Sequence, residues 1–414
     1  MDEKLRTRAV EDDEEGAGAG AGGACFGSTI SSRGPHQGHA KTCAGNGSHG
    51  SEVAEDGLPL ETLPLRVSCI VADCVAPWTK ELADAAALLH IPFWTSTAAS
   101  FSMSAHLSLL ISYGHVPVKT DCWVQGKKWM LDAPLIECIP GVPPFPVTDL
   151  PGEFAQAETL SDPCLQFLAA AFEYKKGTAT PILLHSVYEL ESQVFDALQT
   201  QGFAVKAVGP LLCHSVPQRT NHESLRWLEM QAASSVIYVA LGTVSHLNPK
   251  EALALGHGLQ ASGRPFLWVM RRDEVLHALP EAVRGCGMIL PWVPQEEVLR
   301  HGAISAFFSH CGWNSTLESM WDGVPMVACP LGMEQRSNAR RIVEHWKMGV
   351  ELKRQVDGSF TKEAVEEALE EVMKPTYRNA AAHVKEIARR AAREGGTSHS
   401  NLISLTHLLH GAPS

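Results

Sequence analysis

The sequence predicts an α/β protein with parallel sheets, because short apolar runs alternate regularly with helical patterns. The chain has 414 residues, which is enough for two domains with substantial cores. The alternation is clearest after residue 235, where helical stretches separate successive apolar runs. Such alternation is typical of a parallel sheet covered by helices on both faces. The runs span residues 236–241, 265–270, 286–290, 304–309 and 324–329.

Residues 1–64 differ from the rest of the chain and are predicted to form a mostly disordered tail. They contain an acidic run at residues 11–15 and a Gly-Ala repeat, with too few apolar side chains to build a core. Gly18, Gly20 and Gly23 match the spacing of a dinucleotide-binding loop. Neither a strand pattern before them nor a helix pattern after them supports that interpretation. A nicotinamide-dependent oxidoreductase is therefore the weakest of the functions considered.

Residues 65–212 are predicted to form an N-terminal domain. The β-branched apolar run at 67–73 predicts a buried strand, a helical pattern covers 79–90, and 91–95 predicts a second strand. Five prolines between residues 139 and 151 predict a loop, and residues 181–185 predict another strand.

Residues 213–395 are predicted to form a second domain, followed by a final helix within 396–414. Asn248 before Pro249 predicts a helix start, and apolar side chains on one face of 361–374 predict an amphipathic helix. Ligands of parallel sheets bind beyond the carboxyl ends of the strands. The site should therefore lie in the loops at 242–247, 291–295 and 310–315.

Composition excludes several classes of function. The net charge is −12 and no Lys/Arg cluster stands out, so a nucleic-acid partner is not expected. No apolar run is long enough to span a membrane, and no secretory signal follows the N-terminal Met-Asp-Glu-Lys. The 11 cysteines form no CxxC pair, which favours reduced core residues over a metal or disulfide framework. We expect a cytoplasmic protein, whose oligomeric state the sequence leaves open.

The segment around residue 310 has the pattern of a diphosphate site. A predicted strand at 304–309 leads through His310 and Gly312 into a predicted helix that begins near Asn314 and Ser315. The amides at a helix start are unpaired and carry partial positive charge, so they attract anions. Gly312 would let a phosphate approach the backbone closely.

Each of these residues also has an interpretation that needs no ligand. Ser315 and Glu318 have the spacing of a capping box, in which the side chains satisfy the helix start themselves. His310 alone is more typical of a structural histidine, and Trp292 alone is more typical of a core residue. Local sequence leaves these alternatives open.

Residues 292–335 as a whole resemble the signature box of the plant UDP-glycosyltransferases, glycosyltransferase family 1, and match it without a gap. Shorter similarities to the same family extend over residues 52–410. They include VSCIVAD at 67–73, IPFWT at 91–95, HSVYELE at 185–191, SVIYVALGT at 235–243 and GTSHSN at 396–401.

This resemblance implies a GT-B fold of two Rossmann-like domains, the N-terminal one incomplete, with a UDP-sugar as co-substrate and no metal or other cofactor. It implies inverting transfer of a sugar to a hydroxyl of a small lipophilic acceptor, such as a flavonoid or phenol. The implied donor contacts are Trp292 and Val293 for uracil, Gln295 and Glu318 for ribose, Thr243, His310, Gly312, Asn314 and Ser315 for diphosphate, and Glu334, Gln335 and Thr95 for the sugar. Gln335 at the end of the box indicates glucose.

The resemblance also implies a histidine base oriented by an aspartate, as in other base–orienter pairs. Asp73 matches the aspartate. His39, in the sequence PHQGH, is the candidate base, although the residues around it lack the pattern of a strand or helix. A coincidental match at His39 would leave a UDP-binding relative without a base, which is the alternative function. A second departure is Cys329, where the family usually has tryptophan, and we expect looser packing there.

Overall fold

The computed structural model describes residues 67–118, 134–173, 175–212, 221–242, 247–271, 276–277 and 279–411. These residues belong to one compact unit. The predicted tail, the candidate base His39 and the candidate diphosphate contact Thr243 lie outside the described residues. Within the described ranges, no helix has both the length and the apolar character that crossing a bilayer requires.

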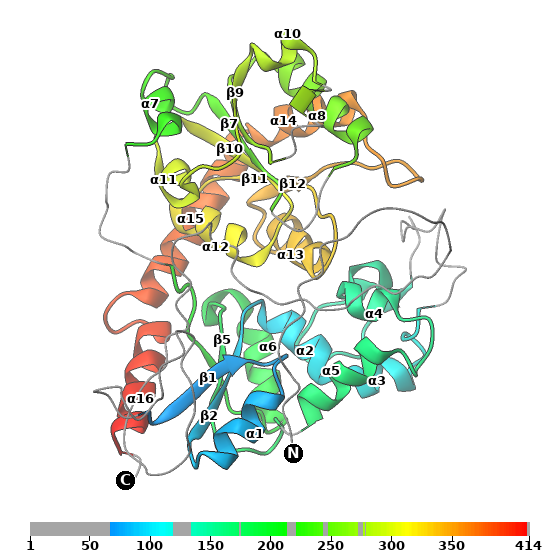
Figure 1. Ribbon diagram of the computed structural model, residues 1–414, viewed down its shortest axis with the longest axis vertical. Coiled ribbons are helices and arrows are strands. Elements are labelled where there is room, and N and C mark those ends of the chain that lie inside the picture. Colours follow the sequence, from blue (N-terminus) through cyan, green and yellow to red (C-terminus); the bar gives the residue numbers. More distant parts are fainter. Residues whose placement is uncertain are drawn as a thin grey trace, which may run out of the picture. The chain divides into compact units, whose positions relative to one another are not determined.

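The first sheet has four parallel strands in the order β1-β2-β5-β6 among the described residues (Figure 1). Asp73, the last residue of β1, lies opposite Phe93 of β2, which in turn pairs with Leu183 of β5. The carboxyl ends of these strands therefore share one edge of the sheet. The bounds are β1 (Cys69–Asp73), β2 (Leu89–Trp94), β5 (Ile182–Leu184) and β6 (Val205–Ala207).

Helices and short elements connect these strands, and two of them differ from the sequence prediction. The helix predicted over 79–90 ends at Ala85, because Ala87 takes a positive φ of 53° and the chain then enters β2. The loop predicted at 139–151 contains the two-residue strand β4 (Phe145–Pro146), which pairs with β3 (Leu135–Ile136), and the 3-10 turn η3 (Val147–Asp149). The helices are α1 (Trp78–Ala85), α2 (Ala98–Ala105), α3 (Leu107–Ser112), α4 (Gly152–Gln156), α5 (Pro163–Glu173) and α6 (Tyr188–Thr200).

The second sheet has six parallel strands in the order β12-β11-β10-β7-β8-β9. The chain runs outward from β7 to β9 and then returns to place β10 on the other side of β7. The carboxyl ends of β7 and β10 therefore form a topological switch point, where ligands of such sheets bind. The bounds are β7 (Val236–Ala240), β8 (Phe266–Val269), β9 (Gly287–Leu290), β10 (Ile304–Ser309), β11 (Met326–Ala328) and β12 (Gly349–Glu351).

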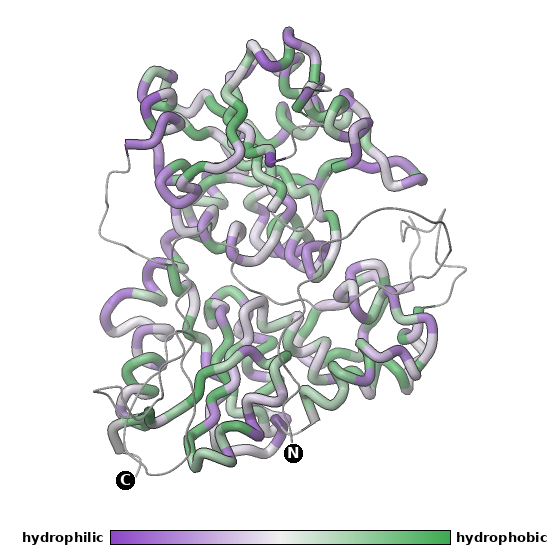
Figure 2. Tube along the Cα trace, in the orientation of Figure 1, coloured by the Kyte–Doolittle hydropathy of each residue, from purple (hydrophilic) through white to green (hydrophobic). Residues whose placement is uncertain are grey.

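Side chains alternate between the two faces of this sheet and build two apolar cores. Tyr238 and Phe307 belong to one core with α12 and α15, whereas Val239 and Phe308 belong to the other with α8 and α14. Figure 2 shows the strands coloured mainly hydrophobic and α7 mainly hydrophilic. The helices are α7 (Glu223–Glu229), α8 (Pro249–Ala261), α10 (Glu281–Arg284), α11 (Gln295–Arg300), α12 (Trp313–Asp322), α13 (Gln335–Arg340) with the π-helical turn η4 (Arg341–His345), α14 (Lys362–Val372), α15 (Pro375–Ala392) and α16 (Thr397–Gly411).

The last helix, α16, packs on the first sheet rather than on the second. Leu402, Leu405 and Leu409 contact the apolar cluster that contains Cys69 of β1 and Ile91 of β2. Asn401 adds a 2.8 Å hydrogen bond from its amide to the carbonyl of Ala207 in β6. The C-terminal segment therefore contributes to the core of the first sheet.

Candidate functional site

Helix α12 begins at the switch point, and its N-terminus is not capped by a side chain. The N-cap residue is Gly312, and no side chain there accepts a hydrogen bond from the first turn. Ser315 is the third residue of the helix, so the capping box that Ser315 and Glu318 could have formed is not present. The alternative in which Ser315 and Glu318 cap the amides of the first turn is therefore excluded. These amides can donate hydrogen bonds to an anion, and the exposed side chain of Asn314 lies in the same turn.

The ring of His310 lies between two glycines, one from each strand end of the switch point. A Cβ atom at Gly312 would lie 2.4 Å from its Nε2, and one at Gly242 would lie 2.6 Å from the same atom. Gly242 also has a φ of +79°, which favours glycine. Both glycines are therefore required by the position of this imidazole.

Burial keeps His310 uncharged at neutral pH. It lowers the pKa of His310 to about 4, an effect that the nearby backbone carbonyl of Ala240 partly opposes. A neutral imidazole at the start of α12 provides one N–H donor and one acceptor nitrogen without requiring a buried positive charge.

Trp292 and Val293 follow the carboxyl end of β9 and face different environments. Val293 is buried in the core, whereas the side chain of Trp292 is 49% exposed and meets the His222 ring edge-on at 5.4 Å between centroids. The interpretation of Trp292 as a core residue is therefore excluded. A half-exposed indole beyond a strand end has the geometry of a stacking surface for a planar ring.

Gln295, Ser315 and Glu318 form one hydrogen-bonded group at the start of α11 and α12. The amide nitrogen of Gln295 donates to Ser315 Oγ at 3.0 Å and to Glu318 Oε2 at 2.6 Å. The Gln295 oxygen accepts from the hydroxyl of Tyr238 at 2.8 Å. Polar atoms from β7, α11 and α12 are thereby held in fixed positions, and α11 begins three residues after the half-exposed Trp292.

Glu334 and Gln335 lie at the start of α13. Gln335 Oε1 accepts from the amides of Leu331 and Gly332 at 2.8 and 3.0 Å, which fixes the preceding turn. Burial raises the pKa of Glu334, while hydrogen bonds from Asn338 and Ser96 oppose the rise. Asn338 also donates to the carbonyl of Cys311 at 3.0 Å, so it connects this turn to the start of α12.

Asp73 and Thr95 meet at the carboxyl edge of the first sheet. Thr95 Oγ1 donates to Asp73 Oδ2 at 3.2 Å, and the Val75 amide donates to the other carboxylate oxygen at 3.0 Å. Lys175 is 1% exposed in the same region, and its Nζ donates to the carbonyl of Cys74 at 3.2 Å. Burial lowers the pKa of Lys175 to about 8, although Cys74 and Asp73 act in the opposite direction.

A family model described as UDP-glucoronosyl and UDP-glucosyl transferase matches residues 160–390. Linamarin synthase 1 of Manihot esculenta is 31% identical over 356 residues, which cover 81% of this chain and 73% of that protein. A 7-deoxyloganetic acid glucosyltransferase of Catharanthus roseus is 31% identical over 366 residues, 82% of this chain and 73% of the relative.

The chain belongs to the UDP-glycosyltransferase family. Its fold is also that of solved glycosyltransferases, because Phytolacca americana UGT2, complexed with UDP-2-fluoro-glucose and pterostilbene, superposes with a TM-score of 0.72. The two are 26% identical, and the match covers 84% of this chain and 77% of the other. The prediction of a GT-B fold with two Rossmann-like parallel sheets is thereby confirmed.

The structure of this glycosyltransferase adds residues that the sequence analysis missed. Tyr238 and Asn338 hold Gln295 and Glu334 in place, and Ser96 reaches Glu334 from the first-sheet side at 3.4 Å. The only sequence signal for Tyr238 was its position in a predicted buried strand, because the hydroxyl of a buried tyrosine requires a hydrogen-bond partner. Asn338 stands one helical turn after Glu334, a spacing that places both on one face of a helix.

The expected loosening at Cys329 is not observed. Cys329 is fully buried, and its sulfur accepts from a guanidinium nitrogen of Arg354 at 3.2 Å. Arg354 also donates to the carbonyl of Pro330 at 3.1 Å and lies over the ring of Phe360. The planar guanidinium of Arg354, in the loop that follows β12, therefore packs beside the smaller Cys329.

Among the described residues, no group of three or more His, Cys, Asp or Glu side chains is arranged to hold a metal ion.

Proposed function

We propose that this UDP-glycosyltransferase transfers glucose from UDP-glucose to a hydroxyl of a small lipophilic acceptor, with inversion at the sugar. The observation that carries the donor assignment is an uncapped helix start beside a neutral histidine at the switch point. Gln295 joins this helix to the start of α11, which follows the half-exposed indole of Trp292. In this proposal Trp292 stacks on uracil, the backbone of Val293 pairs with its edge, and Gln295 and Glu318 bind the ribose.

The diphosphate would lie at the start of α12. His310, Gly312, Asn314 and Ser315 surround that start, and Thr243 would approach from the loop after β7. The partial positive charge of the helix end stabilises the charge that develops on the leaving diphosphate. We propose that this replaces a metal ion, so that a chelator such as EDTA leaves activity unchanged.

The sugar would lie between Glu334 and Gln335 on one side and Thr95 on the other. The acceptor oxygen forms a bond to the anomeric carbon while the bond to the diphosphate breaks, and the acceptor proton passes to a histidine base. Asp73 would orient and stabilise that histidine. His39 is the candidate from the sequence.

The choice of acceptor class is supported by the relatives. They include a flavonol 3-O-glucosyltransferase of Arabidopsis thaliana, 29% identical over 360 residues, and the pterostilbene complex of the Phytolacca enzyme. We infer a small lipophilic acceptor with a hydroxyl group, such as a flavonoid or simple phenol.

The test is transfer from UDP-glucose to a panel of flavonols and simple phenols, read by mass spectrometry, with UDP affinity measured on the same protein by calorimetry. A glucosylated product with a β-linkage supports the proposal. UDP binding without transfer to any acceptor would indicate the binding-only alternative. Absence of UDP binding would refute the donor site. The His39→Ala variant of an active protein then tests the base, since retained transfer would assign it elsewhere.

A further inference from the structure

The segment HSVYELE contains a fully buried carboxylate, that of Glu191, which the donor and acceptor roles above do not use. Its side chain is 0% exposed, and it lies in α6 where the helix departs from regular geometry, with φ −138° and ψ 28°. A charged group removed from water in this way needs several partners to be tolerated.

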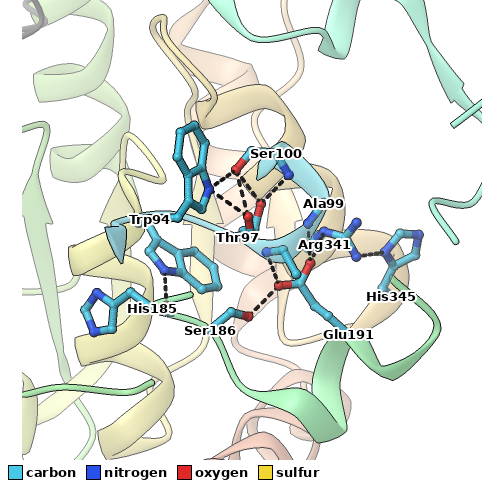
Figure 3. A network of polar contacts seen from close by, with 11 residues as sticks. Trp94, Thr97, Ala99, Ser100, His185, Ser186, Glu191, Arg341 and His345 are labelled. Carbon is cyan, nitrogen blue, oxygen red and sulfur yellow. Dashed lines mark hydrogen bonds and ion pairs between the residues drawn. The ribbon is translucent and has the colours of Figure 1, made fainter. Parts of the chain in front are cut away.

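Glu191 has partners in the segments that cover the first sheet and in η4, which precedes β12 of the second sheet (Figure 3). On the first-sheet side, the amides of Ala98 and Ala99 donate to its two oxygens at 2.8 and 3.1 Å, and the Ser186 hydroxyl also donates. On the second-sheet side, Arg341 Nε lies 3.1 Å from Glu191 Oε1, with 6% of the arginine side chain exposed.

The two amides belong to the first turn of α2, which starts directly after the turn that carries Thr95 and Ser96. Thr97 caps the helix by accepting from the Ser100 amide at 3.0 Å, and Glu191 satisfies the two amides before it. A carboxylate at this end also interacts favourably with the helix dipole. Glu191 therefore fixes the direction in which the turn at Thr95 and Ser96 points.

Arg341 belongs to the helical stretch that starts with Gln335 and has Glu334 as its N-cap. Because Glu191 also binds the first amides of α2, the ion pair links the start of α2 to the helical stretch that follows Glu334. Thr95, a proposed sugar contact, lies just before the start of α2. The direct contact between those two starts is weak, a 3.4 Å hydrogen bond from Ser96 to Glu334. The buried pair of Glu191 and Arg341 is a stronger connection than this hydrogen bond, because both partners are shielded from solvent. Arg336 and Arg340 of α13 also pair with Asp149 of η3.

We propose that Glu191, acting through Arg341 and the first amides of α2, is a positioning residue that holds the two halves of the sugar subsite in register. This inference rests on the proposed function, in which Thr95 and the Glu334–Gln335 pair face the same sugar. It assigns a positioning role to HSVYELE, a segment whose pattern otherwise indicates only a strand end followed by a helix start.

The experiment compares the full chain with the Glu191→Gln variant and with the milder Arg341→Lys variant. All proteins are assayed at a temperature at which thermal melts show each of them to be fully folded. Affinities for UDP and for UDP-glucose are measured by calorimetry, and transfer kinetics are measured on the best acceptor. UDP should bind within about threefold of the parent, because its proposed contacts lie on the second sheet. Affinity for UDP-glucose relative to UDP should fall, and kcat should fall by about 10–100-fold, as for other small displacements of reacting groups.

Asp322→Asn is the matched control. The carboxylate of Asp322 is 6% exposed and pairs with Arg300 and Arg389 at the far end of α12. The Asp322→Asn variant therefore also removes a buried charge, but it leaves the contacts between Glu191, Arg341 and α2 intact. It should lower the melting temperature without changing kcat or the UDP-glucose to UDP affinity ratio.

Two results would overturn the inference. One is a Glu191→Gln variant whose kcat and affinity ratio stay within about twofold of the parent. The other is equal loss of affinity for UDP and UDP-glucose, which would indicate a purely structural role. A parent protein that binds neither ligand would instead refute the proposed donor site, and the positioning role would fall with it. If the parent binds both ligands but transfers to no acceptor, the affinity ratio alone decides.

Discussion

Replacing Trp292 with alanine should weaken UDP binding by about fivefold or more while leaving the fold intact. The indole is 49% exposed, and His222 contacts it only edge-on at 5.4 Å. Stacking of one base on an aromatic side chain contributes about 1–3 kcal/mol, which corresponds to about five- to 150-fold in affinity. Because half of the side chain already faces solvent, the loss of stability should be well below the roughly 3–5 kcal/mol of a fully buried tryptophan.

The assay is calorimetric titration with UDP at fixed salt, together with a thermal melt of each variant. Trp292→Phe keeps an aromatic face and should bind UDP within about threefold of the parent. Trp78→Ala is the matched control, because Trp78 is 59% exposed on α1 of the first sheet and has no proposed donor contact. It should leave UDP affinity unchanged.

The stacking role would be refuted if Trp292→Ala bound UDP within about twofold of the parent. It would also be refuted if affinity fell only in proportion to the unfolded fraction, because Trp292 would then serve to hold α7 through His222.

Three further predictions concern the start of α12, Asp73 and the buried His185. Gly312→Ala places a methyl group 2.4 Å from His310 Nε2, so it should displace the ring and lower UDP affinity at least about tenfold. Unchanged UDP affinity in calorimetric titration would show that the position of the His310 ring does not affect UDP binding. Asp73→Asn should lower kcat/KM for transfer by about 10²–10⁴-fold without changing UDP affinity, since Asp73 lies on the first sheet; equal transfer rates for parent and variant would remove Asp73 from the mechanism. Burial lowers the pKa of His185 to about 4 from 6.5, so the unfolded state binds the extra proton between those pH values and stability is lost as pH falls through that window. The stability advantage of the parent over His185→Gln, measured by urea unfolding, should therefore shrink by about 3 kcal/mol between pH 7 and pH 4, and a constant difference would contradict the buried neutral histidine.

The strands of the second sheet could be predicted because their apolar runs are long and bounded by helix signals. The run at 304–309 coincides with β10, and Asn248 forms a capping box with Glu251 at the start of α8. Strand β12 has three residues and no run that distinguishes it from a loop, so only pairing with β11 defines it. The helix predicted over 79–90 was too long at its C-terminus, because the residue with positive φ that follows the helix is Ala87 and not a glycine that the sequence would reveal.

The proposed donor contacts could be listed from sequence because most of them stand in one segment whose spacing reflects a single strand–loop–helix unit. Tyr238 and Glu191 could not, because each acts on a residue far away in the chain. Tyr238 contacts Gln295, and Glu191 contacts both Ala98 and Arg341. Such contacts depend on how separate elements pack, which local periodicity does not encode.

Several helix starts in this molecule are capped by the protein's own side chains. At α8 the cap comes from Asn248 and Glu251, and at α14 it comes from Thr361. At α2, Thr97 and the buried carboxylate of Glu191 supply it together. The start of α12 has only Gly312, yet it stands at the switch point beside a histidine that two glycines accommodate. Other helix starts, among them those of α1 and α15, also lack a side-chain cap, so an open start alone does not identify a site. The physics that favours an anion is the same at each start, and at α12 the switch point and the accommodated histidine are the reasons to place a ligand's phosphates there.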